Sequence, residues 1–276
     1  MAEFLLYKTL TEFIEANQNY IEENFFAHFN LIKVIQSHPK EDTKIINAFN
    51  IVDNDNSYVL CLVLEGRMLI YSTKWNNNII KKLSDEITFD GVSFSGQKHF
   101  ILDLFTHNKI EYEVFKDRIV YDCEKVTDNI VVSSGQFSLA ETDDLEKISE
   151  LTYNYHLEEY KERAFRDYEN IKNGTKHNLD NELIFKWMDN GEITSIIQVV
   201  SHQCNLPIIG SFYTDKKIRG NGYGSSLLFS LTNYLLSNGY EKCGLVSDAT
   251  NQTTNKIFQG IGYKNIYETI SVHKKK

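Results

Sequence analysis

The sequence is poor in the features that mark secreted, zinc-binding and membrane-spanning proteins. Its four cysteines are scattered and form no Cys-x-x-Cys pair, so neither a disulfide framework nor a zinc site is indicated. The longest apolar run, Tyr58 to Leu64, is much shorter than the roughly 18 residues of a membrane helix. Glu3 and Lys8 break any export-signal pattern. We therefore expect a cytoplasmic protein without a membrane partner or a bound metal.

Basic charge is also scarce in this chain. Its 29 lysines and arginines face 38 aspartates and glutamates, which gives a formal net charge of −9. Because binding to nucleic acid needs a basic face that neutralises phosphates, we expect no nucleic-acid partner. The acidic excess is larger before residue 134 than after it, so the second half is the better host for an anionic ligand.

Apolar and aromatic residues are plentiful, and they predict a globular protein. Hydrophobic residues make up 42% of the 276 positions and aromatic residues 13%, which excludes a disordered chain. The length predicts two domains of ordinary size, with one large domain as the alternative. The polar segment 122–135 is the predicted seam between them. We expect domains at 1–130 and 135–276.

Hydrophobic periodicity predicts alternating helices and strands in the first half. Helical spacing over residues 10–37 predicts two helices that meet near Asn19. Beyond Pro39, the pattern predicts strands at 46–52, 58–65, 67–71, 91–94 and 110–120, helices at 79–87 and 99–105, and an Asn-rich loop at 75–78.

The second half is predicted to begin with a strand and an N-capped helix. The strand covers residues 136–140, and the helix follows Thr142-Asp143-Asp144. A polar stretch at 170–181 then precedes three predicted strands at 182–188, 193–202 and 207–214, of which the first two are joined by the turn Asp189-Asn190-Gly191.

A glycine-rich turn between a strand and a helix is the most informative segment. Arg219-Gly220-Asn221-Gly222-Tyr223-Gly224 follows the strand that ends at Thr214 and opens a helix that stops at Asn238-Gly239. Glycines let main-chain amides converge, and a helix N-terminus adds partial positive charge, so the turn suits a phosphate or diphosphate. Ser225 stands where the dinucleotide fingerprint requires glycine, and the Gly-Lys-Ser/Thr of NTPases is missing.

These residues resemble the Arg/Gln-x-x-Gly-x-Gly/Ala acyl-CoA loop of the GNAT superfamily of N-acetyltransferases. A second match lies downstream, where Leu245 to Tyr263 is similar to the closing strand, the Asn-initiated helix and the Gly-Tyr strand entry of that superfamily. Two ordered motifs are more specific than either alone. The resemblance is strongest over residues 136–273. It implies an α/β (α+β) fold in which a mixed, mostly antiparallel sheet is flanked by helices.

The first half also resembles the leading domain of tandem GNAT proteins. Glu22 to Phe26 and Gly91 to Gly96 lie about where such chains carry an Asn-Phe helix entry and a strand-to-helix glycine pair, and no Arg-x-x-Gly-x-Gly precedes residue 219. The resemblance therefore implies two GNAT-like domains, of which the first is degenerate and lacks its own cofactor.

The resemblance also implies roles for particular residues. Main-chain amides of the strand before the loop would pair with the pantetheine arm of acetyl-CoA and polarise its thioester carbonyl, and the loop would hold the diphosphate. The implied cofactor-binding residues are Phe212, Thr214, Arg219, Gly220, Asn221, Gly222, Tyr223, Gly224, Ser225, Asn251, Asn255 and Phe258.

Phe258 departs from the family pattern, because many members have there a tyrosine that protonates the leaving thiolate. A phenyl ring has no proton to give, which leaves Tyr213, Tyr263, water or unaided departure of the thiolate. We expect Tyr213 and Asp248 to be the catalytic residues, Asp248 as the base. Other candidates for the base are Glu158, Glu159, Glu162 and His202.

Together these features predict an enzyme that transfers acetyl from acetyl-CoA directly to a primary amine of a small molecule. The acidic balance favours a cationic acceptor, and the chain is expected to be a monomer or a homodimer. The alternative is a non-catalytic acyl-CoA-binding or regulatory module, which Phe258 and the degenerate first half would fit.

Overall fold

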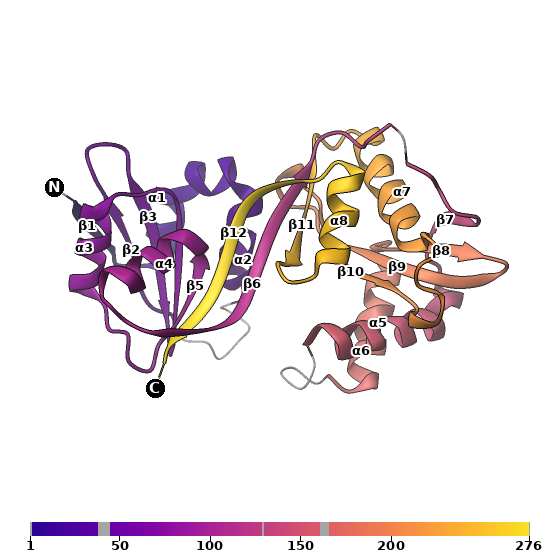
Figure 1. Ribbon diagram of the computed structural model, residues 1–276, viewed down its shortest axis with the longest axis horizontal. Coiled ribbons are helices and arrows are strands. Elements are labelled where there is room, and N and C mark those ends of the chain that lie inside the picture. The colour runs from indigo at the N-terminus through magenta and orange to yellow at the C-terminus, as the bar shows by residue number, and fades with distance from the viewer. Residues whose placement is uncertain (1, 38–44, 129, 161–165, 276) are drawn as a thin grey trace. The chain divides into compact units, whose positions relative to one another are not determined.

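A computed structural model describes residues 2–37, 45–128, 130–160 and 166–275 of the chain (Figure 1). The chain forms two compact units. Unit 1 comprises Met1–Val120, Ser247–Gln252 and Asn265–Lys276, and unit 2 comprises Tyr121–Val246 and Thr253–Lys264. The division into sequence domains at 1–130 and 135–276 stays a prediction. The two units are defined by packing, and each of them combines segments that are distant in the sequence. Glu162 lies outside the described residues.

Unit 1 is a sheet with helices packed against it. Its strands follow the order β1-β2-β3-β4-β5-β12-β6, and β4 and β5 form a parallel pair between antiparallel neighbours. The elements are β1 (Glu3–Tyr7), α1 (Leu10–Glu23), α2 (Phe25–Ser37), β2 (Ile45–Val52), β3 (Tyr58–Leu64), β4 (Arg67–Lys74), α3 (Asn77–Glu86), β5 (Ser93–Gln97), α4 (Lys98–His107), β6 (Tyr112–Cys123) and β12 (Lys264–Lys274).

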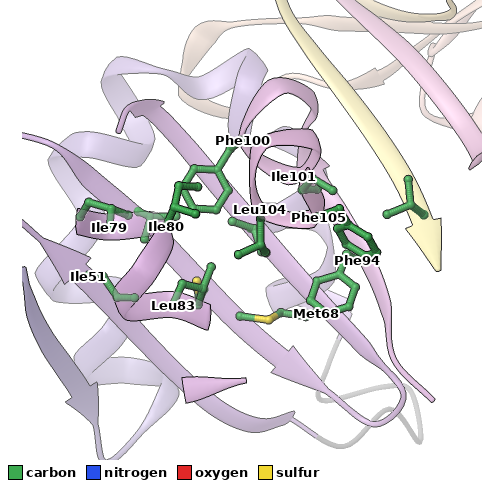
Figure 2. Close-up of a cluster of buried hydrophobic side chains, with 14 of the residues drawn as sticks. Ile51, Met68, Ile79, Ile80, Leu83, Phe94, Phe100, Ile101, Leu104 and Phe105 are labelled. Atoms are coloured by element: carbon green, nitrogen blue, oxygen red, sulfur yellow. The ribbon is translucent and has the colours of Figure 1, made fainter. Parts of the chain in front are cut away.

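The apolar faces of α3 and α4 form the core of unit 1 (Figure 2). Ile79 and Leu83 of α3 and Leu104 of α4 are fully buried against the sheet. Ile79 and Leu83 are four residues apart, which places them on one face of α3. Burying such side chains contributes about 1.5–3 kcal/mol each, so this layer stabilises the unit.

The C-terminal strand β12 belongs to unit 1, although it follows the second half of the sequence. It pairs with β5 in antiparallel register, with Ile270 opposite Gly96. The hydroxyls of Ser95 and Ser271 lie 2.8 Å apart across this pair. Unit 1 is therefore completed by the last strand of the chain.

Unit 2 repeats the plan with strands in the order β11-β10-β9-β8-β7. β10 and β11 form its parallel pair, and the other pairs are antiparallel. The elements are β7 (Gln136–Leu139), α5 (Leu145–Tyr160), α6 (Tyr168–Asp180), β8 (Ile184–Asp189), β9 (Glu192–Ser201), β10 (Ile208–Thr214), α7 (Tyr223–Ser237), β11 (Cys243–Asp248) and α8 (Gln252–Ile261). The predicted mixed, mostly antiparallel sheet flanked by helices is confirmed.

Several element boundaries differ from those predicted. The two helices predicted for residues 10–37 exist, but they meet at Asn24 rather than near Asn19. The residues 77–78 that were predicted as loop begin α3, because the side chain of Asn76 caps that helix. The strand β1 was not predicted, and the polar stretch at 170–181 is mostly the helix α6.

Candidate functional site

The glycine-rich turn joins β10 to α7 within unit 2. Gly220 and Gly222 have φ angles of 89° and 79°, a left-handed conformation that only glycine adopts without strain. Gly222 is the N-cap of α7, and being glycine it offers no side chain to cap the helix. The N-cap side chain that ordinarily accepts hydrogen bonds from the first amides of a helix is therefore missing at α7. A helix of 15 residues also adds partial positive charge at this end.

Gly224 lets the first turn of α7 lie directly on β10. A Cβ atom at this position would be 2.8 Å from Oγ1 of Thr214 and 3.1 Å from the ring of Phe212. The hydroxyl of Thr214 is itself 2.9 Å from that of Ser195 on β9. The structure thus brings together Phe212, Thr214 and Gly224, three of the residues predicted to contact the cofactor.

β10 bulges and leaves its parallel partner as it approaches the turn. It pairs with β11 only at Ile208 and Ile209, and its register with β9 jumps from Gly210 to Tyr213. Ser211 within this β-bulge has a φ of 48°. On the β11 side, the part of β10 beyond Ile209 has no partner in the register of the described strands. This main-chain edge is suited to pair with an extended ligand.

A segment predicted as linker holds the turn in place. The Oγ of Ser133 donates to the carbonyl of Asn221 at 2.7 Å, and the amide of Ser133 donates to Oγ of Ser226 at 2.8 Å. A Cβ at Gly222 would lie only 2.5 Å from Oγ of Ser133. Sequence analysis missed this contact, because a Ser-Ser-Gly segment is also typical of a plain linker.

Other predicted loop residues contribute to the shape of the turn. The side-chain amide of Asn221 donates to the carbonyl of Ile218 at 2.9 Å, which closes the turn on itself. The hydroxyl of Tyr223 donates to Asp189 at 2.7 Å, and this hydrogen bond raises the pKa of the phenol. Ser225 is half-buried in the first turn of α7.

Glu158 of α5 forms hydrogen bonds with side chains of β10 and of the glycine-rich turn. It accepts a hydrogen bond from the hydroxyl of Tyr213 at 2.8 Å and from Nη2 of Arg219 at 3.0 Å on each carboxylate oxygen. Burial and the bond to Glu158 raise the pKa of Tyr213. The Tyr213 proton is therefore directed at a carboxylate and held tightly.

Phe258 of α8 lies within a cluster of aromatic rings. Its ring centroid is 6.2 Å from that of Phe212, 5.7 Å from that of Tyr121 and 6.1 Å from that of Tyr263. The hydroxyl of Tyr263 is 2.8 Å from Oγ1 of Thr232 and is buried. Asn255, one helical turn before Phe258, is also buried. Both α8 residues predicted to contact the cofactor are therefore buried, and Phe258 packs on rings of unit 2.

The last two residues of β11, Ser247 and Asp248, are grouped with unit 1 together with Asn251, whereas the rest of β11 and the glycine-rich turn belong to unit 2. The carboxylate of Asp248 accepts hydrogen bonds from the amide and hydroxyl of Thr250 at 2.9 and 2.6 Å. It also lies 3.4 Å from Arg118. The amide of Asn251 donates to the carbonyl of Asp248 at 3.1 Å, just before α8 begins.

Comparisons with known proteins identify the family of the second half and the fold of the whole chain. Residues 143–263 match the model of the Acetyltransferase (GNAT) family. No curated protein matches the sequence. Among solved structures, a GNAT-family acetyltransferase from Colwellia psychrerythraea is similar over 99% of this chain and 100% of its own, with 11% identity and a TM-score of 0.59.

Two further structures have the same fold. A GCN5-related N-acetyltransferase from Sphaerobacter thermophilus is 15% identical over 82% of this chain and 79% of its own, with a TM-score of 0.57. A tandem GNAT protein from the clavulanic acid biosynthesis pathway is 8% identical over 99% of this chain and 98% of its own, with a TM-score of 0.50. Residues 143–263 therefore form a GNAT acetyltransferase domain, and the N-terminal region also has a GNAT-like fold. The family match implies acyl transfer from acyl-CoA.

The described part of the chain contains no group of three or more His, Cys, Asp and Glu side chains placed to hold a metal ion. None of its described helices is both long enough and apolar enough to cross a membrane.

Proposed function

We propose that unit 2 transfers acetyl from acetyl-CoA to a primary amine of a small molecule by direct attack, in the cytoplasm. The observation that carries this proposal is the uncapped start of α7 beside the unpaired, bulged edge of β10. Main-chain amides at a helix start suit a diphosphate, and a strand edge suits the amide-bearing pantetheine arm. The two features lie next to each other at Gly224, as a molecule carrying both groups requires.

The residues of this chain would act by binding and polarising the thioester. Acetyl-CoA supplies an acyl group with a thiolate leaving group. Main-chain amides from Gly220 to Ser225 would hold the diphosphate, with Asn255 and Phe258 of α8 beside the arm. Amides of Phe212 and Thr214 would stabilise the negative charge that grows on the carbonyl oxygen as the amine attacks.

Proton transfers need groups other than Tyr213, in our proposal. The hydroxyl of Tyr213 donates its hydrogen bond to Glu158, so its proton is not directed at a leaving group. The ring of Phe258 has no proton to donate. A thiol with an ordinary pKa of about 8.5 leaves as thiolate without a donor. Asp248 stays the predicted base, which would take a proton from the acceptor ammonium directly or through water.

The acceptor and the organisation of the chain are further parts of the proposal. A net charge of −9 favours a cationic amine over an anionic one. We propose two GNAT-like repeats, at 1–130 and 135–276, of which only the second binds acetyl-CoA, in a monomer or homodimer.

A charge placed at the start of α7 tests the cofactor site. Ser225→Glu puts a carboxylate among the amides proposed to hold the diphosphate, whereas Ser225→Gln has the same size without charge. Because ligand binding to the native state raises its thermal stability, acetyl-CoA should raise the Tm of the parent and of Ser225→Gln but not of Ser225→Glu. An equal rise in all three would place acetyl-CoA elsewhere.

The alternative function, a non-catalytic acyl-CoA-binding module, is favoured by Phe258 and by the commitment of Tyr213 to Glu158. Steady-state release of CoA with a panel of small amines separates the two. Saturable release that depends on the amine supports the enzyme. Tight binding of acetyl-CoA with no release above hydrolysis supports the module.

A further inference from the structure

Glu158 stands at the centre of a charged cluster that ties α5 to the start of the glycine-rich turn. It lies in the last turn of α5, and its side chain is 29% exposed. Besides Tyr213 and Arg219, Nζ of Lys216 lies 3.3 Å from its carboxylate. Lys216, just before the turn, and Arg219, its first residue, therefore have their charge balanced by one carboxylate on α5.

The side chain of Arg219 is fixed by contacts with the end of β10 and with Glu158 of α5. Its Nε donates to the carbonyl of Thr214 at 3.0 Å, and Nη2 donates to both oxygens of Glu158. The guanidinium also lies over the ring of Tyr213, 5.0 Å from its centroid, which is a cation–π contact. Turning toward a ligand at the start of α7 would break all of these contacts together.

We propose that Glu158 is a positioning residue, which holds Arg219 against the end of β10 and thereby fixes where the glycine-rich turn begins. In this arrangement Arg219 is a structural brace, and the diphosphate is left to the main-chain amides from Gly220 onward. This inference rests on the proposed acetyl-CoA site. It assigns a function to the arginine of the turn that differs from direct contact with phosphate.

The protonation state of Glu158 agrees with this function. Burial alone would raise the pKa of its carboxyl, but hydrogen bonds from Tyr213 and Arg219 outweigh burial, so the pKa lies below its ordinary value. The group is therefore a carboxylate at neutral pH and a weak proton acceptor. This makes Glu158 a poor general base, although the sequence alone left that possibility open.

A double-mutant cycle tests the brace. Glu158→Gln keeps the size of the side chain and removes its charge, and Arg219→Gln removes the partner. We expect each single change to raise the Kd for acetyl-CoA by about tenfold, with the double variant no worse than either, since both remove one interaction. Calorimetric titration of the full chain with acetyl-CoA measures this. The KM for acetyl-CoA should rise likewise, with kcat nearly unchanged.

Two neighbours provide matched controls. Glu159→Gln removes a charge from the next position of α5, and Lys217→Gln removes one from the exposed lysine between Lys216 and the turn. Lys217→Gln is the neutral control and should not change the Kd by more than about twofold, whereas Glu159→Gln shows whether any carboxylate at this end of α5 has the same effect as Glu158. Unfolding without ligand checks that every variant is folded.

Three results would overturn the brace. Tighter binding in Glu158→Gln would show that Glu158 competes with the diphosphate for Arg219. Additive losses in the double variant would show that Arg219 contacts phosphate independently. A large fall in kcat with an unchanged Kd, together with loss of the acidic limb of the pH profile, would make Glu158 the base. If the parent itself fails to bind acetyl-CoA, the proposed function fails first.

Discussion

Units 1 and 2 contain the same arrangement of strand, helix, strand and helix. They differ in whether side chains bond the main-chain groups at the first helix start and at the bulge of the strand before it. In unit 1 the series is β4–α3–β5–α4, and in unit 2 it is β10–α7–β11–α8. The first strand of each series, β4 or β10, has a bulge. The register with β3 skips Ser72 and Thr73 of β4, and the register with β9 skips Ser211 and Phe212 of β10. The backbone plan is therefore shared.

The first difference is at the helix start. In unit 1 the side chain of Asn76 accepts hydrogen bonds from the amides of Asn78 and Ile79 at 2.9 and 3.0 Å. Its own amide donates to the carboxylates of Asp53 and Asp55 at 3.0 and 3.1 Å. The start of α3 is thus already capped and faces two negative charges, whereas α7 begins at an uncapped glycine beside lysines and an arginine. Only the latter suits a diphosphate.

The second difference is at the bulge. The hydroxyl of Tyr267 accepts from the amide of Ser72 at 3.3 Å and donates to its carbonyl at 2.9 Å, and the hydroxyl of Tyr20 accepts from the amide of Thr73 at 2.8 Å. Two tyrosines of unit 1 therefore form hydrogen bonds with main-chain groups of its bulge. In unit 2 the hydroxyl of Tyr213 goes to Glu158 instead. Side chains of unit 1 thus bond the main chain of its bulge, whereas the proposed cofactor site of unit 2 depends on main-chain groups of β10 that its own side chains leave open.

The comparison depends on β12 being part of unit 1, and a buried charge on this strand has the largest expected effect. Val272 is fully buried, whereas Ile266 on the same strand is 43% exposed. Val272→Asp should cost about 4 kcal/mol or more, because a carboxyl buried among apolar side chains has no partner. Ile266→Asp should cost less than about 1 kcal/mol. Hydrogen exchange should show residues of β4 and β5 losing protection in Val272→Asp alone. Equal protection would separate β12 from unit 1.

A buried histidine should make the stability of unit 1 depend on pH. His28 is fully buried between the rings of Tyr20 and Tyr71, and its Nδ1 lies 2.9 Å from the carbonyl of Asn24. Burial lowers its pKa from 6.5 to about 4. The unfolded chain then binds the proton more readily between these values, so the free energy of unfolding is full above pH 6.5 and falls as the pH drops toward 4. The shift corresponds to about 3 kcal/mol.

Denaturant unfolding at pH 7 and pH 4.5 measures this loss. His28→Gln should unfold at lower denaturant than the parent at pH 7 but with a smaller difference between the two pH values. His202→Gln, at an exposed position of unit 2, should retain the pH dependence of the parent. If His28→Gln also retained it, another group would be responsible.

Substitution of Gly224 in unit 2 should change the free energy of unfolding by a smaller amount. Gly224→Ala puts a Cβ 2.8 Å from Oγ1 of Thr214, so Thr214 must rotate away from Ser195 or α7 must move from β10, at a cost of about 1–3 kcal/mol. The Kd for acetyl-CoA should rise as well. Gly174→Ala is the matched control, since nothing lies within 4 Å of its added Cβ and its φ is not positive. That helix substitution should stabilise the chain by about 0.5–1 kcal/mol. Unchanged acetyl-CoA binding in Gly224→Ala would contradict the close approach of loop and strand.

The local parts of this comparison could be predicted from the sequence, and the long-range parts could not. Glycines at alternate positions before an apolar helix predict the turn, because φ requirements and helix starts are local properties. The contact of Ser133 with Asn221 joins residues 88 positions apart, and no pattern in the sequence records it. The helix α6 was missed because its buried residues are few and Gly174 interrupts them. The place of β12 beside β5 was missed because strand pairing is decided by packing.

The smallest effect concerns the hydroxyl that closes the bulge of unit 1. Tyr267→Phe keeps the buried ring but removes a hydrogen bond from each of the two main-chain groups of Ser72. Leaving them unsatisfied should cost about 1–2 kcal/mol in the free energy of unfolding. The variant should still bind a single acetyl-CoA per chain, because Asn76 and the two aspartates still exclude a diphosphate from α3. Calorimetric titration measures the stoichiometry, and a second binding event would show that Tyr267 alone had closed unit 1.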